Sequence, residues 1–201
     1  MKNIVYNQSL ILKLAPQHRG VFSIQDLKNI LSCADSVTLY RAIRSLEEHK
    51  ILKNFVRGFY VTSQFDLHAL SQRLCEKSYI SFGNILAKEL LIGSVPQYSV
   101  YAVKIGKNRR YKNPAGEVIH LGVAPQYFFG FTVNDGVAFA DKEKAFLDTL
   151  YFYQKGFKFS FNVYQDIHVN LLDRQKTEKY LENYRNPKFV QFVKGVLNHG
   201  N

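Results

Sequence analysis

The chain has 201 residues, of which 46% are hydrophobic and 14% aromatic, a composition that excludes an intrinsically disordered chain. Its formal net charge of +11 favours an anionic partner, nucleic acid before an acidic membrane surface. No apolar stretch approaches the roughly 18 residues that span a bilayer, and the first residues lack a signal-cleavage pattern, so we expect a cytoplasmic, unprocessed chain.

Three helices are predicted in the first 50 residues. An apolar segment at 9 to 14 ends at Pro16, because proline disfavours further helix. A second helix spans 24 to 31, preceded by Ser23, which can cap it by accepting a hydrogen bond from a backbone amide of the first turn. A short polar turn then leads to a third helix, from 36 to about 49.

The third helix is amphipathic, and a hairpin follows it. Its predicted inward stripe is Leu39, Ala42, Ile43 and Leu46. Its predicted outward face is Ser36, Val37, Tyr40, Arg41, Arg44 and Ser45. The β-rich runs 51 to 56 and 59 to 61 flank Arg57-Gly58, a tight-turn signal. This order of elements predicts a winged helix-turn-helix domain over residues 1 to 66.

In such a domain the second helix of the motif enters the major groove, while the wing contacts phosphates. Arginine is suited to this role because its planar guanidinium matches guanine N7 and O6. The candidate DNA-binding residues are Ser36, Thr38, Tyr40, Arg41, Arg44, Lys53 and Arg57. The alternative is a solvated basic face on a helix that only packs against its neighbours.

Residues 67 to 201 predict a second, mixed α+β domain. A helix expected at 63 to 74 connects the two halves, and further helices are expected at 81 to 93, 141 to 153, 171 to 184 and 187 to 197. Strands of an antiparallel or mixed sheet are expected at 98 to 103, 109 to 111, 118 to 124, 127 to 132 and 137 to 140, with a further strand-like run at 157 to 164. The predicted fold class of the whole chain is therefore α+β.

Two features of this second domain could also meet nucleic acid. A secondary basic patch comprises Lys104, Lys107, Arg109, Arg110 and Lys112. The aromatic run from 151 to 164 could stack bases, although core or interface packing is the commoner use of such a run. For the basic patch the alternative is a solvated hairpin.

The sequence gives little support for an enzyme or a cofactor. Cys33 and Cys75 are far apart, which favours idle thiols in a reducing compartment, and the six histidines lack zinc-site spacing. Asp141, Glu143 and Asp148 share a segment, but helix capping and surface charge explain them better than a catalytic carboxylate pair. We therefore predict no metal, no cofactor and no catalytic residues, with a metal-dependent nuclease or nucleotidyltransferase as a minor alternative.

Several motifs together resemble the AbiEi family of abortive-infection antitoxins. The most specific is A-D-K-E-K-A-F-L-D at 140 to 148, similar to the A-x-x-E-K-A-L-x-D of that family. It is preceded by Tyr79-Ile80-Ser81, Leu90-Leu91-Ile92-Gly93, Val95-Pro96 and Tyr127-Phe128-Phe129-Gly130. The likeness covers about residues 10 to 155, and the tail after about Tyr164 is the part least like the family.

The resemblance implies an antitoxin that represses its own operon by binding inverted repeats in double-stranded DNA. It further implies a second domain that contributes to antitoxicity, and a nucleotidyltransferase-like toxin encoded nearby as functional partner, generally countered without a stable complex. The alternative is a protein-interaction antitoxin that neutralises such a toxin by direct binding. No membrane partner is expected.

Overall fold

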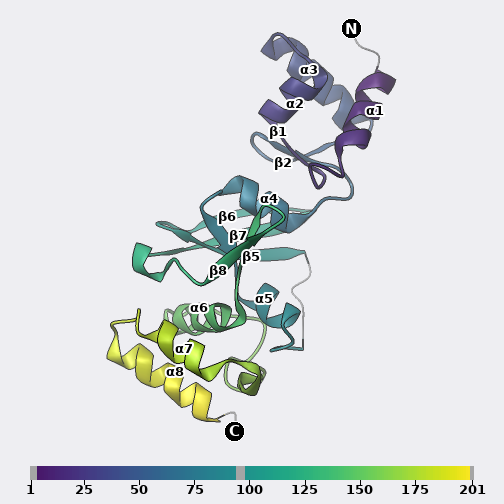
Figure 1. The fold of residues 1–201 in the computed structure, drawn as a ribbon. Helices are drawn as coiled ribbons and strands as arrows, with labels where there is room; N and C mark the ends of the chain where they lie inside the picture. Colours follow the sequence, from purple (N-terminus) through teal and green to yellow (C-terminus); the bar gives the residue numbers. More distant parts are fainter. Residues whose placement is uncertain (1–3, 94–97, 200–201) are drawn as a thin grey trace. The chain divides into compact units, whose positions relative to one another are not determined.

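The computed structural model describes residues 4–93 and 98–199, and it confirms the α+β class (Figure 1). The chain forms two compact units, Met1–Leu70 with Tyr111–Ala115, and Ser71–Arg110 with Gly116–Asn201. The bounds inferred from sequence, 1–66 and 67–201, stay a prediction. Among the described helices none is both long and apolar enough to cross a bilayer. Val95-Pro96, part of the family resemblance, lies outside the described residues.

The first unit consists of three helices and a small antiparallel sheet with strand order β1-β3-β2. Its elements are α1 (Ile4–Leu14), β1 (Val21–Ser23), α2 (Ile24–Leu31), α3 (Ser36–Glu48), β2 (Lys53–Val56) and β3 (Phe59–Val61). β1, which was not predicted from the sequence, pairs with β3 in register Val21 to Val61. Apolar side chains of all three helices, with Phe22, Leu52 and Tyr60, form the core.

Local hydrogen bonds define the start of α2 and the sharp turn between α2 and α3. Ser23 and Asp26 form a reciprocal capping box at the start of α2, which satisfies two backbone donors. After α2, Ser32 adopts a left-handed conformation with φ of 52°. Asp35 then caps α3 by accepting from the amide of Thr38 at 2.8 Å. The turn is therefore fixed at both ends by the local sequence.

The second unit is a mixed sheet with strand order β6-β7-β5-β4-β9-β8. β5 runs parallel to β7 and β4 parallel to β9, whereas β4 with β5 and β8 with β9 are antiparallel. The strands are β4 (Ser78–Ile80), β5 (Ser99–Ile105), β6 (Arg109–Asn113), β7 (Gly116–Val123), β8 (Phe131–Asn134) and β9 (Val137–Ala140). This confirms a mixed sheet, and β4 is a strand that sequence analysis missed.

Helices and short 3-10 turns complete the second half of the chain. They are α4 (Leu67–Leu74), α5 (Gly83–Lys88), η1 (Pro125–Tyr127), α6 (Lys142–Gln154), η2 (Val169–Leu171), α7 (Arg174–Leu181) and α8 (Pro187–His199). α6 is buried along most of its length and contacts α5, α7 and α8 (Figure 1). It is therefore the central helix of this unit.

Three predictions of secondary structure are wrong. The helix expected over 81–93 is shortened to α5, because Phe82 and Leu90 both have positive φ and end the helix on either side. The strand expected over 127–132 begins only at Phe131, after a 3-10 turn that Pro125 initiates. The run 157–164 forms no strand; its rings pack on one another and on Phe82.

Candidate nucleic-acid interface

The outward face of α3 is exposed as its periodicity predicted. Leu39, Ile43 and Leu46 are buried, and Ala42 packs partly buried against the same core. On the other side Tyr40 is 56% exposed, and Ser36, Arg41 and Arg44 are also exposed. α3 thus presents a polar, cationic face to solvent and an apolar face to its own unit.

Charges on this face are only weakly compensated. Arg44 Nε lies 3.2 Å from Glu48 Oε1, with the two side chains 82% and 61% exposed. An exposed ion pair of this kind contributes at most about 1 kcal/mol and breaks readily. Arg44 is therefore available to a stronger anion, and Arg41 has no carboxylate within 4.0 Å among the described residues.

Thr38 takes part in the hydrogen-bonded cap at the start of α3. Its hydroxyl donates to Asp35 Oδ2 at 2.8 Å while its amide donates to Asp35 Oδ1. The hydrogen bond from the Thr38 amide, and after it the hydrogen bond from the Thr38 hydroxyl, hold the pKa of Asp35 below its ordinary value. A carboxylate therefore lies beside the amino end of α3. The Thr38 hydroxyl is committed to the cap rather than left to a phosphate.

The hairpin of β2 and β3 is anchored to the helices. The amide of Ile24, at the start of α2, donates to Gly58 O in the turn at 2.9 Å. The amide of Asn54 donates to Glu47 Oε1 at 3.1 Å, which ties β2 to the end of α3. Lys53 and Arg57 are both exposed. Their positions relative to α3 are therefore set by hydrogen bonds within the unit.

The secondary basic patch is less uniform than its sequence suggested. Lys104 Nζ donates to the carbonyls of Ile105 and Lys107, which holds it against the β5–β6 turn. Arg110 forms an ion pair with Glu117, although its side chain is 63% exposed. Lys107 is exposed, and Lys112, also exposed, belongs to the segment that clusters with the first unit.

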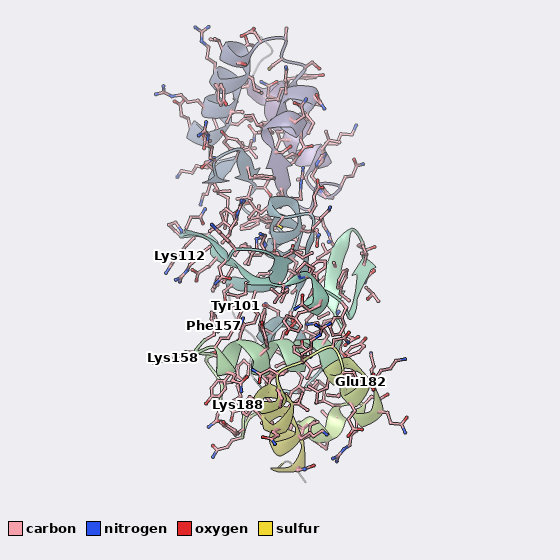
Figure 2. The ribbon with its side chains drawn as sticks, turned by 90° about the vertical axis from the view of Figure 1, so that its left-hand side faces the viewer. Tyr101, Lys112, Phe157, Lys158, Glu182 and Lys188 are labelled. Carbon is pink, nitrogen blue, oxygen red and sulfur yellow. The ribbon has the colours of Figure 1, made fainter. Side chains whose placement is uncertain are left out.

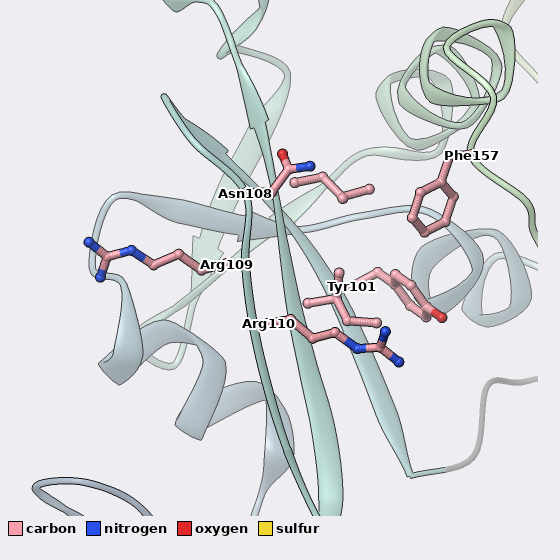
Figure 3. Close-up of a pocket in the computed structure, with 7 residues that line it drawn as sticks. Tyr101, Asn108, Arg109, Arg110 and Phe157 are labelled. Carbon is pink, nitrogen blue, oxygen red and sulfur yellow. The ribbon is translucent and has the colours of Figure 1, made fainter.

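A pocket of about 350 Å³ adjoins part of this patch (Figure 3). Tyr101 and Phe157 line it together with Arg110, whose guanidinium lies near the Tyr101 ring. Figure 3 shows the Arg109 side chain pointing to the other side of the strand, as consecutive strand residues do. Arg109 and Arg110 therefore point to opposite sides of the strand (Figure 3).

The carboxylates considered for catalysis make contacts within the fold. Asp141 caps α6 by accepting from the amide of Lys144 at 2.8 Å, as expected. The expectation of surface charge is wrong for Glu143 and Asp148, which are both 1% exposed. Glu143 accepts from the amide of Asp173 at 3.1 Å and pairs with Lys176. Within the described ranges no three His, Cys, Asp or Glu side chains gather as a metal site would require.

Sequence reasoning also missed a buried polar cluster around Lys144. The ammonium pairs with Asp148, which also accepts from Ser81 Oγ at 2.8 Å and Tyr79 Oη at 3.1 Å. Tyr184 Oη lies 3.3 Å from Lys144 Nζ. The available signal was the four-residue spacing of Lys144 and Asp148 around Ala145-Phe146-Leu147, because a charged pair on an otherwise apolar helix needs an internal partner.

Comparison with known proteins gives a fold likeness. No family model matches the chain, and no curated protein matches it. Among solved structures it is similar to the RV2827C protein from Mycobacterium tuberculosis, with a TM-score of 0.65 and 14% sequence identity. That alignment covers 98% of this chain and 78% of the other. At this identity the likeness concerns the fold alone.

Proposed function

We propose that this chain is a sequence-specific DNA-binding repressor whose first unit is a winged helix-turn-helix. The observation that carries the proposal is the face of α3 on which Tyr40, Arg41 and Arg44 are exposed while the opposite stripe is buried. Such a helix can enter a major groove without losing its contacts to its own core. The net charge of +11 adds long-range attraction to a polyanion.

The proposed mode of binding assigns different roles to the two arginines and to the hairpin. Arg41 and Arg44 would contact base edges, each good bidentate contact to guanine contributing about 1 to 3 kcal/mol of discrimination. Lys53 and Arg57 on the hairpin, with Ser36 at the start of α3, would contact phosphates and so fix the register of the helix in the groove.

The antitoxin role rests on the resemblance to the AbiEi family, carried most specifically by the segment 140–148. On that basis the operator is an inverted repeat upstream of the chain's own gene, and the functional partner is a nucleotidyltransferase-like toxin. The charged residues of this segment hold the second unit together, so we assign them no catalytic role.

A footprinting experiment on the DNA upstream of the gene tests the proposal. We expect a protected inverted repeat that the double variant Arg41→Ala/Arg44→Ala no longer protects at concentrations that saturate the parent chain. Losing two base contacts should weaken specific binding at least about 30-fold. The matched control is Lys179→Ala/Lys194→Ala, which removes the same charge from exposed positions on α7 and α8.

Equal loss of binding in both double variants would mean that only net charge matters, and sequence-specific recognition by α3 would be rejected. Unchanged binding by the arginine variant, with its circular dichroism spectrum intact, would also reject it. A stable stoichiometric complex with the neighbouring toxin, combined with no DNA affinity at moderate salt, would instead support the direct-binding antitoxin.

A further inference from the structure

A second pocket in the second unit, of about 390 Å³, lies where the end of α6, the turn η1 and the start of α8 meet. Its lining includes four aromatic rings that contact one another. Tyr127 stacks on Tyr184 with ring centroids 4.8 Å apart, and Tyr184 lies 4.7 Å from Phe189. Tyr184 and Phe189 are buried, whereas Tyr127 and Tyr151 are partly exposed. The pocket therefore has an aromatic floor in which two rings are partly exposed.

Two lysines without an acidic partner stand at this pocket. Lys155 and Lys188 are exposed lining residues, and in the described part of the chain neither ammonium has a carboxylate within 4.0 Å. Lys155 Nζ lies 4.2 Å from the centroid of the Tyr151 ring. None of the described lining residues is acidic. Figure 2 places Lys188 on one side of the unit and Glu182 on the other. The pocket is therefore cationic as well as aromatic.

The remaining lining residues carry amides. Gln154 ends α6, and Asn186 precedes α8 and accepts from the amide of Lys188 at 3.0 Å through Oδ1. The Gln154 amide offers both donor and acceptor, and Asn186 still has an NH₂ donor. Amide side chains of this kind pair with the edges of nucleobases. The pocket thus has a partner for each part of a nucleotide: aromatic rings for the flat base, amides for the hydrogen-bonding edge of the base, and lysines for the anionic phosphate.

We propose that this pocket binds a nucleoside monophosphate, with the base against Tyr127 and Tyr151 and the phosphate between Lys155 and Lys188. The volume is in the range of pockets that hold small ligands. A cationic ligand would be repelled by the lysines, and a purely apolar ligand would give neither amide a hydrogen-bond partner. None of the described pocket residues belongs to α3, so this proposal can be tested independently of the proposed duplex binding.

Isothermal titration calorimetry of the full chain at low salt, with AMP, GMP, CMP, UMP and inorganic phosphate, tests this assignment. We expect saturable one-to-one binding of at least one nucleotide, with inorganic phosphate at least about tenfold weaker because it lacks the stacking contribution of a base. Lys155→Gln/Lys188→Gln should weaken the nucleotide at least about tenfold. Both positions are exposed, so the variant should fold.

The matched control is Lys179→Gln/Lys194→Gln, which removes the same charge at exposed positions outside the pocket and should leave affinity within about twofold. A second variant, Tyr151→Leu, should weaken all nucleotides by a larger factor than it weakens phosphate, because the ring also contacts Lys155 Nζ. Absence of nucleotide binding, equal affinity for phosphate, or equal loss in the two lysine variants would overturn the proposal. So would a single-stranded oligonucleotide that binds far more tightly than any mononucleotide through the same lysines, because the occupant would then be a strand.

Discussion

Removing the charge of Lys144 should destabilise the second unit more than removing any exposed lysine. The side chain is fully buried, pairs with Asp148, and lies 4.9 Å from the Phe129 ring centroid and 5.6 Å from that of Tyr79. Burial lowers the pKa of Lys144 and raises that of Asp148, while each charge opposes the shift of its partner. In Lys144→Met the methionine fills similar space, but the buried carboxylate loses its counter-charge.

The expected loss in the free energy of unfolding is about 3 to 5 kcal/mol, the usual cost of leaving one partner of a buried ion pair alone. Asp148→Asn should cost a similar amount, because the ammonium would then be the uncompensated group. The double variant Lys144→Met/Asp148→Asn leaves neither charge of this pair, and the asparagine oxygen can still accept from Ser81 and Tyr79. Its cost should therefore be smaller than the sum of the two single costs by at least about 2 kcal/mol.

Urea denaturation at pH 7 measures this double-mutant cycle, with hydrogen exchange of α6 amides to assign the transition to the second unit. Lys179→Met, the same substitution at an exposed position on α7, is the control and should change the free energy by no more than about 0.5 kcal/mol. A loss of less than about 1 kcal/mol for Lys144→Met, or strict additivity in the cycle, would refute the reasoning that the pair acts as a buried ionic unit.

Two further predictions concern pH and backbone conformation. Burial first and the Lys104 charge second lower the pKa of His120 from 6.5 to about 4, so the unfolded chain takes up a proton before the folded one does. The free energy of unfolding should therefore fall between pH 6.5 and 4, by about 3 kcal/mol, and urea melts of His120→Asn should lack that slope. Gly20 has φ of 71°, and a Cβ there would lie 2.3 Å from Gln64 O. Gly20→Ala should lower stability by at least about 2 kcal/mol in thermal melts. The control Gly58→Ala, also at positive φ but with open space around it, should lose only about 1 kcal/mol; equal losses would contradict the steric argument.

The first unit was the more predictable from sequence because its signals are local. Ser23 and Asp35 mark the helix starts through side chains that bond three residues ahead, and Arg57-Gly58 marks a turn between two short β-rich runs. Such signals depend on a few neighbouring residues, so the sequence contains them in full. The exposed face of α3 follows from the same periodicity that buries Leu39 and Ile43.

The second unit was less predictable because its elements depend on distant partners. Ser78–Ile80 forms a strand because β5 and β9 pair with it. Its own residues gave no strand signal that set it apart from the helix predicted from residue 81. The aromatic run 157–164 has the composition of a strand, but its rings find each other and Phe82 without forming one. The sequence placed Arg110 in a basic patch, and in the fold Glu117, seven residues away on β7, pairs with it.

The segment 140–148, on which the proposed antitoxin role rests, also holds the second unit together. Asp141 caps α6, Glu143 bonds the start of α7, and Lys144 pairs with Asp148 inside the core. Residues with such roles are constrained by folding, so their likeness to another sequence carries information about fold before it carries any about activity. Information about activity lies on exposed side chains that the fold does not require, and on α3 these include Arg41 and Arg44. The footprinting variants at these two positions can therefore test whether α3 recognises DNA.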